Sequence, residues 1–107
     1  MRLPADAIIA PEKLTRYLLV HQPRGDKSAF LARAGYTLEN ADRLLQDIRT
    51  QALPLDVTEL HSTQFGDFYE IRAGLTGPNG VTLRVRSIWM EEKLSKLTKF
   101  ITLIPES

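Results

Sequence analysis

The stretch TGPNGVTLRVRSIW, residues 76–89, predicts the tip of a β-hairpin followed by a strand. Its Pro-Asn-Gly segment, residues 78–80, suits a three-residue turn in which proline takes the second position and glycine the left-handed one. Beyond the turn, apolar and polar residues alternate, as they do in a strand with one buried face. The stretch therefore predicts an antiparallel sheet whose open face carries Arg84 and Arg86.

The length of this turn decides which residues lie opposite one another on the two strands. A three-residue turn gives the pairs Leu75 with Leu83, Ala73 with Val85, Ile71 with Ser87, Tyr69 with Trp89, and Arg72 with Arg86. The apolar residues of both strands then share one face, whereas a turn one residue shorter or longer would place Ile71 and Leu75 beside the arginines. We therefore expect Gly80 to adopt a positive φ, and Trp89 and Tyr69 to lie in the core.

A second turn is predicted at Gly66-Asp67, where glycine in the first position suits a two-residue hairpin. That turn would place His61 opposite Arg72, so that His61, Arg72 and Arg86 form a row across three strands. Arginine is suited to bidentate phosphate binding, and histidine transfers protons near neutral pH. Two interpretations of the open face remain: an anion-binding site, or ordinary solvent-exposed surface.

The first half of the chain, residues 11–52, has the spacing of about three helices. Pro11 suits the first turn of one helix, Asp26 can cap the next, and Thr37 can cap the third. The apolar stripe of the third helix comprises Ala41, Leu44, Leu45, Ile48 and Ala52. With four strands expected over residues 55–104, the fold class is α+β, with N-terminal helices packed on a four-stranded antiparallel sheet.

Length and composition predict a single domain over residues 1–107, with a net charge of +1 and no cysteine. Only His21 and His61 offer imidazole ligands, and neither has a carboxylate at ligand spacing, so we expect no metal and no cofactor. The apolar patch near the start is interrupted by Pro11, which predicts neither a signal peptide nor a membrane span. We therefore expect a cytoplasmic protein without a membrane partner.

Four segments carry a resemblance to a known family: HQPRGDKSAF at residues 21–30, GYTLEN at 35–40, TGPNG at 76–80 and VRSIW at 85–89. They resemble a small bacterial family of unknown function. That family occurs as stand-alone proteins, many of them cyanobacterial, and as the last domain of large secreted polymorphic toxins. The order of helices and then an antiparallel sheet is also similar, at the level of fold, to the barnase, EndoU, colicin and RelE group of metal-independent ribonucleases.

These resemblances imply two classes of function. The first is a metal-independent endoribonuclease of toxin type, which needs a base, an acid and cations on the phosphate. The residues expected to be catalytic are His21, Lys27, His61 and Arg86, and those expected to bind RNA are Arg24, Arg72, Arg84 and Thr98. Whether Thr98 reaches the site is open, because both faces of residues 97–104 are apolar enough to be buried. The alternative is a non-catalytic module, immunity-like or accessory, whose basic sheet face docks a cognate protein.

Overall fold

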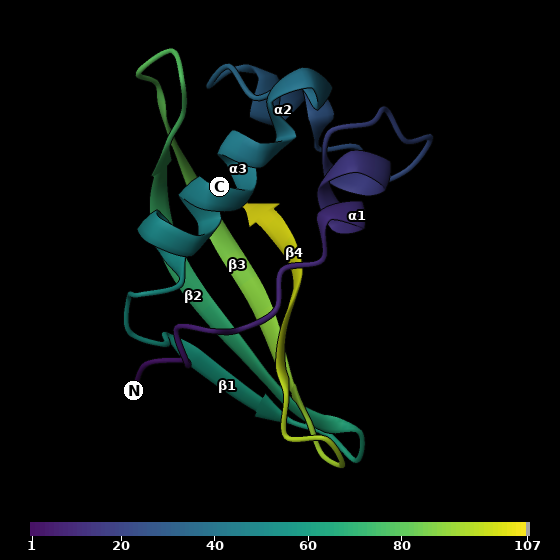
Figure 1. Cartoon of the computed structure of the whole chain (residues 1–107), viewed down its shortest axis with the longest axis vertical. Helices are drawn as coiled ribbons and strands as arrows, with labels where there is room; N and C mark the ends of the chain where they lie inside the picture. Colours follow the sequence, from purple (N-terminus) through teal and green to yellow (C-terminus); the bar gives the residue numbers. More distant parts are fainter. Residues whose placement is uncertain (107) are drawn as a thin grey trace.

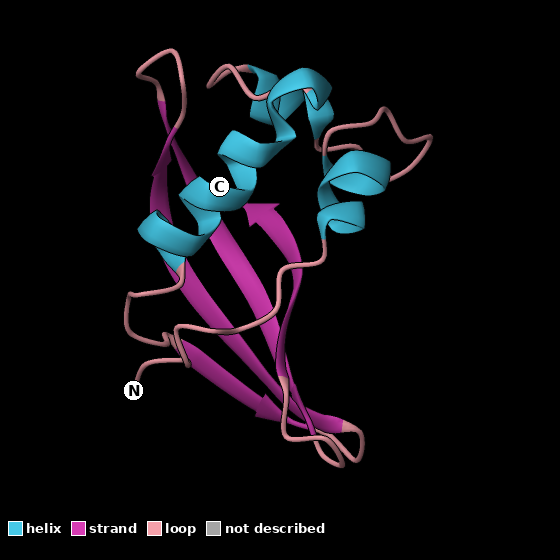
Figure 2. Cartoon of the chain, in the orientation of Figure 1, coloured by secondary structure: helices cyan, strands magenta, loops and turns pink. Residues whose placement is uncertain are grey.

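The structure of the chain, a computed structural model, describes residues 1–106 and divides them into a helical half and a sheet (Figures 1 and 2). The helical segments are α1 (Pro11–Lys13), η1 (Leu14–Leu18), α2 (Ser28–Ala32), η2 (Leu38–Asn40), α3 (Ala41–Asp47) and η3 (Ile48–Ala52). The strands are β1 (Glu59–Ser62), β2 (Gly66–Thr76), β3 (Thr82–Glu92) and β4 (Thr98–Pro105). The strands form one antiparallel sheet in the order β1-β2-β3-β4, which confirms the predicted α+β fold.

The hairpin between β2 and β3 has the predicted register. Tyr69 lies opposite Trp89, and Arg72 lies opposite Arg86. The Gly77 N–H donates to the Val81 carbonyl at 3.0 Å, which closes the three-residue turn, and Gly80 has a φ of 87°. The register therefore places the apolar residues of both strands on the face that the helices cover (Figure 1).

The turn of this hairpin also packs against the end of α2, a contact that the sequence did not predict. The Asn79 side chain donates to the Arg33 carbonyl at 3.1 Å, and a Cβ on Gly77 would lie 2.7 Å from the Ala34 Cβ. Gly77 is thus required for close approach between two elements that lie far apart in the sequence. The turn consequently connects the helical half to the sheet.

The core lies between the helices and the sheet. Leu44 and Ile48 are fully buried, whereas Leu45 is only half-buried at its margin, so the predicted stripe is correct at its centre. Trp89 is fully buried, as predicted, and packs edge-on against Phe100 with ring centroids 5.2 Å apart. Its indole N–H finds the partner that a buried indole needs, the hydroxyl of Ser87.

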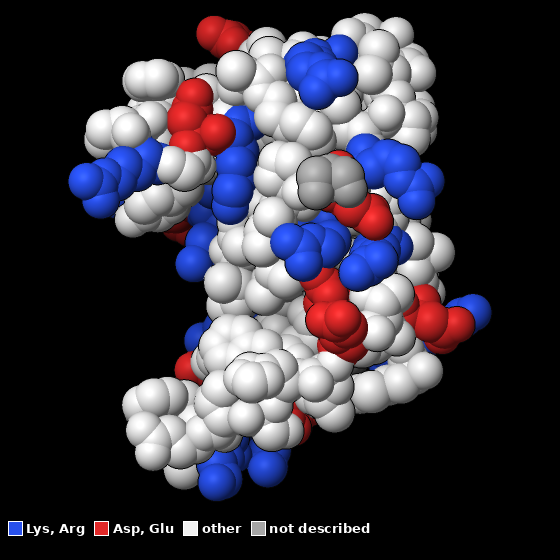
Figure 3. Space-filling model, turned by 180° about the vertical axis from the view of Figure 1, so that it is seen from behind, with Lys and Arg blue, Asp and Glu red and all other residues white. Residues whose placement is uncertain are grey.

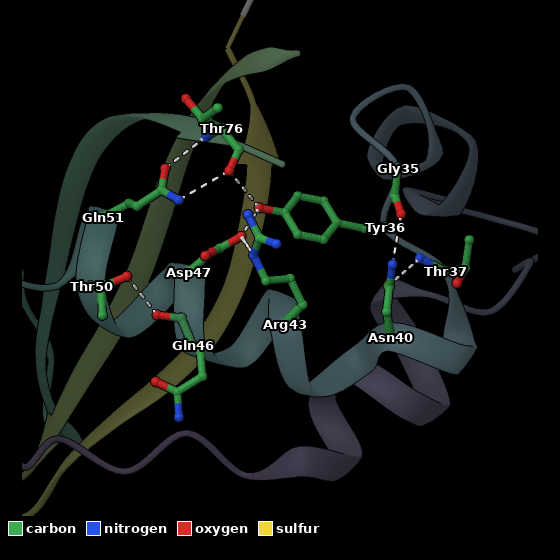
Figure 4. Close-up of polar contacts among 10 residues, drawn as sticks. All are labelled: Gly35, Tyr36, Thr37, Asn40, Arg43, Gln46, Asp47, Thr50, Gln51 and Thr76. Atoms are coloured by element: carbon green, nitrogen blue, oxygen red, sulfur yellow. Dashed lines mark hydrogen bonds and ion pairs between the residues drawn. The ribbon is translucent and has the colours of Figure 1, made fainter. Parts of the chain in front are cut away.

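A buried polar network connects α3 to the end of β2 (Figure 4). The Tyr36 hydroxyl donates to Asp47 Oδ2 at 2.6 Å and also contacts the Thr76 carbonyl at 3.2 Å. Arg43 donates to the same carboxylate oxygen at 2.9 Å, and Gln51 donates to the same carbonyl at 3.0 Å. Within residues 1–106, no buried side-chain atom of this network lacks a hydrogen-bond partner, so the network holds α3 and η3 against the end of β2.

The outer edge of β4 is covered over only part of its length. Ile8 exchanges backbone hydrogen bonds with Thr98 and Phe100 at 2.8 and 2.7 Å. Beyond them, β4 pairs with β3 through a bulge, because Trp89 lies opposite Phe100 and Ile88 lies opposite Thr102. The segment after the bulge lies next to the loop that follows η1, where Lys27 donates to the Thr102 hydroxyl.

Candidate functional site

The open face of the sheet carries three arginines, Arg72, Arg84 and Arg86, which we call the arginine face. Its guanidinium groups lie on β2 and β3, on the side opposite Trp89, as the register predicts. From behind, this face shows basic and acidic side chains intermixed at its centre and a hollow beside them (Figure 3). The three arginines therefore share one face as predicted, but acidic side chains lie among them.

Each of these arginines has a carboxylate of the chain itself as its partner. Arg86 Nη1 lies 2.9 Å from Glu70 Oε1, a hydrogen-bonded pair in which the Glu70 side chain is only 8% exposed. Arg72 Nη1 and Arg84 Nε lie 3.6 and 4.0 Å from the two carboxylate oxygens of Glu106. These carboxylates offset the repulsion expected between like charges that lie opposite each other on a sheet.

The predicted row of His61, Arg72 and Arg86 was wrong, because the turn before β2 is not where the sequence placed it. His61 lies opposite Phe68, and Gly66 begins β2 rather than forming the turn. Phe68 and Arg72 are on the same face, so His61 faces the right side but lies about 13 Å along the strand from the position opposite Arg72. Gly66 is needed for another reason, since a Cβ there would collide with the Glu91 carbonyl.

His61 instead lies diagonally from Glu70 across the β1–β2 pair. The two side chains line a shallow groove of about 160 Å³ together with Glu59, Phe68, Tyr69 and Ile88. One oxygen of Glu70 is held by Arg86, while Oε2 is buried and makes no hydrogen bond within residues 1–106. The structure thus brings together His61, Glu70 and Arg86, of which sequence reasoning had not assigned Glu70 to a site.

A larger cavity lies at the open edge of β4, and we call it the edge pocket. It encloses about 290 Å³. Its lining residues are Lys13, Tyr17, Leu18, Gln22, Arg24, Gly25, Lys27, Ile101 and Thr102. Three of these side chains are cationic, and within the described part of the chain no carboxylate lines the cavity.

Lys27 is the most constrained cation of the edge pocket. Its ammonium group donates to the Thr102 hydroxyl at 2.9 Å across 75 residues of sequence. Burial lowers the pKa of Lys27 below its ordinary value, because the charged form loses hydration. No ion pair to Lys27 is found among residues 1–106, so the charge is partly desolvated and only a neutral hydroxyl stabilises it.

Asp26 organises the loop that carries His21 and Lys27. Its Oδ1 accepts from the Ser28 N–H and hydroxyl at 3.1 and 2.7 Å, but the N-cap of α2 is Lys27 rather than the predicted Asp26. These two hydrogen bonds are the main reason why the pKa of Asp26 is lowered. Its other oxygen lies 3.1 Å from His21 Nδ1, so the ionised carboxylate favours the tautomer that leaves Nε2 free to accept a proton.

The bulge in β4 decides which threonine faces the edge pocket. Thr98 is 5% exposed and packs on the helix-covered side, whereas Thr102 lies after the bulge and lines the pocket. Thr102, Ile88 and Glu70 lie opposite one another on neighbouring strands, which puts the pocket about 10 Å from Glu70 on the same side of the sheet. The structure therefore places the edge pocket, with Lys27 and Arg24, on the same side of the sheet as the arginine face, whereas Thr98 lies on the other side.

Two further classes of site were searched for in the described residues. Within residues 1–106, no three His, Cys, Asp or Glu side chains converge in a way that could hold a metal ion. None of the helices described is both long enough and apolar enough to cross a membrane.

Fold and site together define a small α+β domain with one helix-covered sheet face, one open face and a cationic pocket at the sheet edge. The chain belongs to a family described as a domain of unknown function, DUF6883, whose model matches residues 3–107. This confirms the expected membership of an uncharacterised family.

A solved structure has a similar fold. It is a chain of the "Contact-dependent growth inhibition toxin - immunity protein complex from Klebsiella pneumoniae 342", with a TM-score of 0.63 and 17% identity. The match covers 96% of this chain and 96% of that one. At this identity the likeness establishes a shared fold over nearly the whole length of both chains. No curated protein matches the sequence.

Proposed function

We propose that this protein is a toxin-type endoribonuclease that cleaves RNA without a metal ion, with the reaction at the edge pocket. The observation that carries the proposal is the composition of that pocket, in which Lys13, Arg24 and Lys27 converge without a lining carboxylate. A partly desolvated lysine without an anionic partner lowers the stability of the fold, and an anionic ligand would supply that partner. The likeness to a chain from a toxin–immunity complex fits a toxin-related role and equally an immunity-like one.

The proposed chemistry uses the 2′-hydroxyl of RNA as the nucleophile. His21 lies on the same loop as Arg24 and Lys27 but does not line the pocket. With Nδ1 beside Asp26, its Nε2 takes the proton of that hydroxyl as the 2′-oxygen bonds to phosphorus. Arg24 and Lys27 stabilise the charge that builds up on the phosphoryl oxygens. The bond from phosphorus to the 5′-oxygen breaks, and Lys27, made more acidic by burial, donates a proton to that oxygen. The products are a 2′,3′-cyclic phosphate and a 5′-hydroxyl.

The arginine face would then guide the remainder of the RNA strand. Arg86, held by Glu70, and His61 in the shallow groove lie on the same side of the sheet as the pocket. In this scheme these two residues bind nucleotides beside the scissile bond rather than perform the proton transfers. Thr98 has no role in it, because its side chain is buried on the other side.

A second function, a non-catalytic protein-interaction module, is favoured by a different feature. Phe65 and Leu94 are 71% and 98% exposed, and the turns that carry them meet where the Lys93 N–H donates to the Phe65 carbonyl. Exposed apolar side chains gathered in this way suit a protein partner. The solved structure with a similar fold is a complex of protein partners, which fits a protein-binding role.

The two functions are separated by incubating the purified protein with total RNA in the presence of EDTA. We expect the wild type to leave 2′,3′-cyclic phosphate ends, and Lys27→Met and His21→Ala to lose at least about a hundredfold in rate. Lys93→Met is the matched control, because it removes an equal charge from an exposed position outside the pocket and should cleave like the wild type. RNA left intact by the wild type would contradict the ribonuclease and favour the interaction module.

A further inference from the structure

On the arginine face, the guanidinium groups of Arg72 and Arg84 lie on either side of the Glu106 carboxylate. We call this pair of arginines the fork. Arg84 lies opposite Gly74, which is two residues along β2 from Arg72, so the two arginines are diagonal neighbours on the open face. Gly74 has no side chain to place between them. Both side chains remain half-exposed or more, at 50% for Arg72 and 75% for Arg84. Solvent therefore has access to the fork.

Glu106 occupies this fork without satisfying it. Its carboxylate oxygens lie 3.6 Å from Arg72 Nη1 and 4.0 Å from Arg84 Nε, both beyond hydrogen-bond distance. Oε2 of Glu106 is buried, yet it makes no hydrogen bond with any described residue. The contact differs from the pair of Arg86 and Glu70, which is hydrogen-bonded at 2.9 Å.

The backbone explains why the carboxylate stays in place although its own contacts are long. The Glu106 N–H donates to the Arg84 carbonyl at 2.9 Å, which extends the pairing of the tail along β3. The position of the Glu106 side chain is therefore fixed by the backbone hydrogen bond rather than by its contacts with the two guanidiniums. Ion pairs of this length to guanidiniums that are half-exposed or more contribute little, so a better anion can replace this carboxylate at low cost.

We propose that Arg72 and Arg84 form a phosphate-binding site and that Glu106 is its internal competitor. A phosphate has more oxygens than a carboxylate and can accept hydrogen bonds from both planar guanidiniums at once. Binding it requires the Glu106 side chain to swing away, while the backbone hydrogen bond to Arg84 stays in place. We identify the phosphate as that of a nucleic-acid backbone, and this identification rests on the proposed function. The phosphate site itself is argued from Arg72, Arg84 and Glu106 alone.

Competition of this kind makes a quantitative prediction. The apparent affinity for phosphate is reduced by the fraction of molecules in which Glu106 fills the fork. Replacing Glu106 by glutamine removes the charge but keeps the shape, so we expect phosphate binding to tighten by roughly three- to tenfold. Glu39→Gln removes the same charge from an exposed position on η2, away from the open face, and should change the affinity by less than about twofold.

The test is a titration of the full chain with inorganic phosphate, followed through the arginine Nε–H signals in NMR spectra. We expect Glu106→Gln to tighten binding at the signals of Arg72 and Arg84, and Arg84→Ala added to Glu106→Gln to abolish the gain. A parallel titration with a short single-stranded RNA, made non-cleavable by 2′-deoxy substitution, distinguishes a backbone phosphate from free phosphate. An unchanged affinity in Glu106→Gln, or an equal gain in Glu39→Gln, would contradict the proposal that Glu106 competes with phosphate.

The results that would contradict the ribonuclease proposal differ from those that would contradict the phosphate site. Inorganic phosphate needs no cleavage to bind, so tightening in Glu106→Gln would support the fork even in a protein that leaves RNA intact. RNA cleavage that depends on Lys27 and His21, without any phosphate-induced shift of the Arg72 and Arg84 signals, would contradict the phosphate site. The ribonuclease proposal would still hold.

Discussion

Replacing Tyr36 by phenylalanine tests the polar network that holds α3 on the sheet. The change removes a 2.6 Å hydrogen bond to Asp47, a carboxylate that is itself only 6% exposed, while keeping the ring in its fully buried site. A hydrogen bond to a charged group contributes about 1.5–3 kcal/mol. Asp47 keeps Arg43, and the Thr76 carbonyl keeps Gln51, so neither acceptor loses its last partner. We therefore expect a loss in the lower part of that range, about 1.5–2 kcal/mol.

The assay is urea unfolding followed by circular dichroism, with thermal unfolding as a second measure. At about 4 °C per kcal/mol for a domain of this length, the melting temperature should fall by about 6–8 °C. Tyr17→Phe is the matched control, because Tyr17 is 60% exposed, and it should stay within about 0.5 kcal/mol of the wild type. A Tyr36→Phe protein as stable as the control would refute the stabilising role of the network.

The same tyrosine makes a prediction for alkaline pH. Burial, with Asp47 as the second cause, raises the pKa of Tyr36 far above its ordinary value of 10.0. Above pH 10 the unfolded chain therefore loses a proton that the folded chain keeps, and the free energy of unfolding falls by up to about 1.4 kcal/mol per pH unit. Tyr36→Phe should lose stability less steeply between pH 10 and pH 11 than the wild type, and parallel curves would contradict this.

Two further predictions concern the hairpin turn and the edge pocket. Gly77→Ala should lower the free energy of unfolding by about 1–3 kcal/mol, because the added Cβ meets Ala34. Gly80→Ala has open space around the added Cβ, so it should lower the free energy of unfolding only by the roughly 1–2 kcal/mol that a left-handed backbone costs alanine. Equal m-values and a smaller midpoint shift for Gly80→Ala than for Gly77→Ala in urea would agree with this. Lys27→Met should leave the free energy of unfolding unchanged or raised, since it removes a desolvated charge, while it abolishes RNA cleavage. A Lys27→Met protein that is clearly destabilised would show that the lysine is structural.

Local patterns were enough to predict the fold class and the central hairpin. The Pro-Asn-Gly turn limits the loop to a few geometries, and alternation with a period of two then allows only one register that buries Ile71, Leu75 and Trp89 together. Because turn chemistry and side-chain alternation act over a few residues, both can be inferred without knowledge of the rest of the molecule. The opposed pair of Arg72 and Arg86 follows from the same reasoning.

The position of His61 was decided by packing between strands. Gly66 looks like a turn residue in the sequence, but its lack of a side chain serves the close approach of the Glu91 carbonyl on β3. Glycine satisfies both demands equally well, so its presence alone cannot distinguish them. As a result, His61 lies opposite Phe68 and diagonal to Glu70, and not opposite Arg72.

Tertiary structure alone decided the composition of the site. A single bulge in β4 turned Thr98 inward and Thr102 toward Lys27, a partner 75 residues away in the sequence. The tail brought Glu106 to Arg72 and Arg84, which a strand pattern shows only as exposed cations. Contacts of this kind depend on how separate elements meet in space, and no periodicity within one segment carries that information.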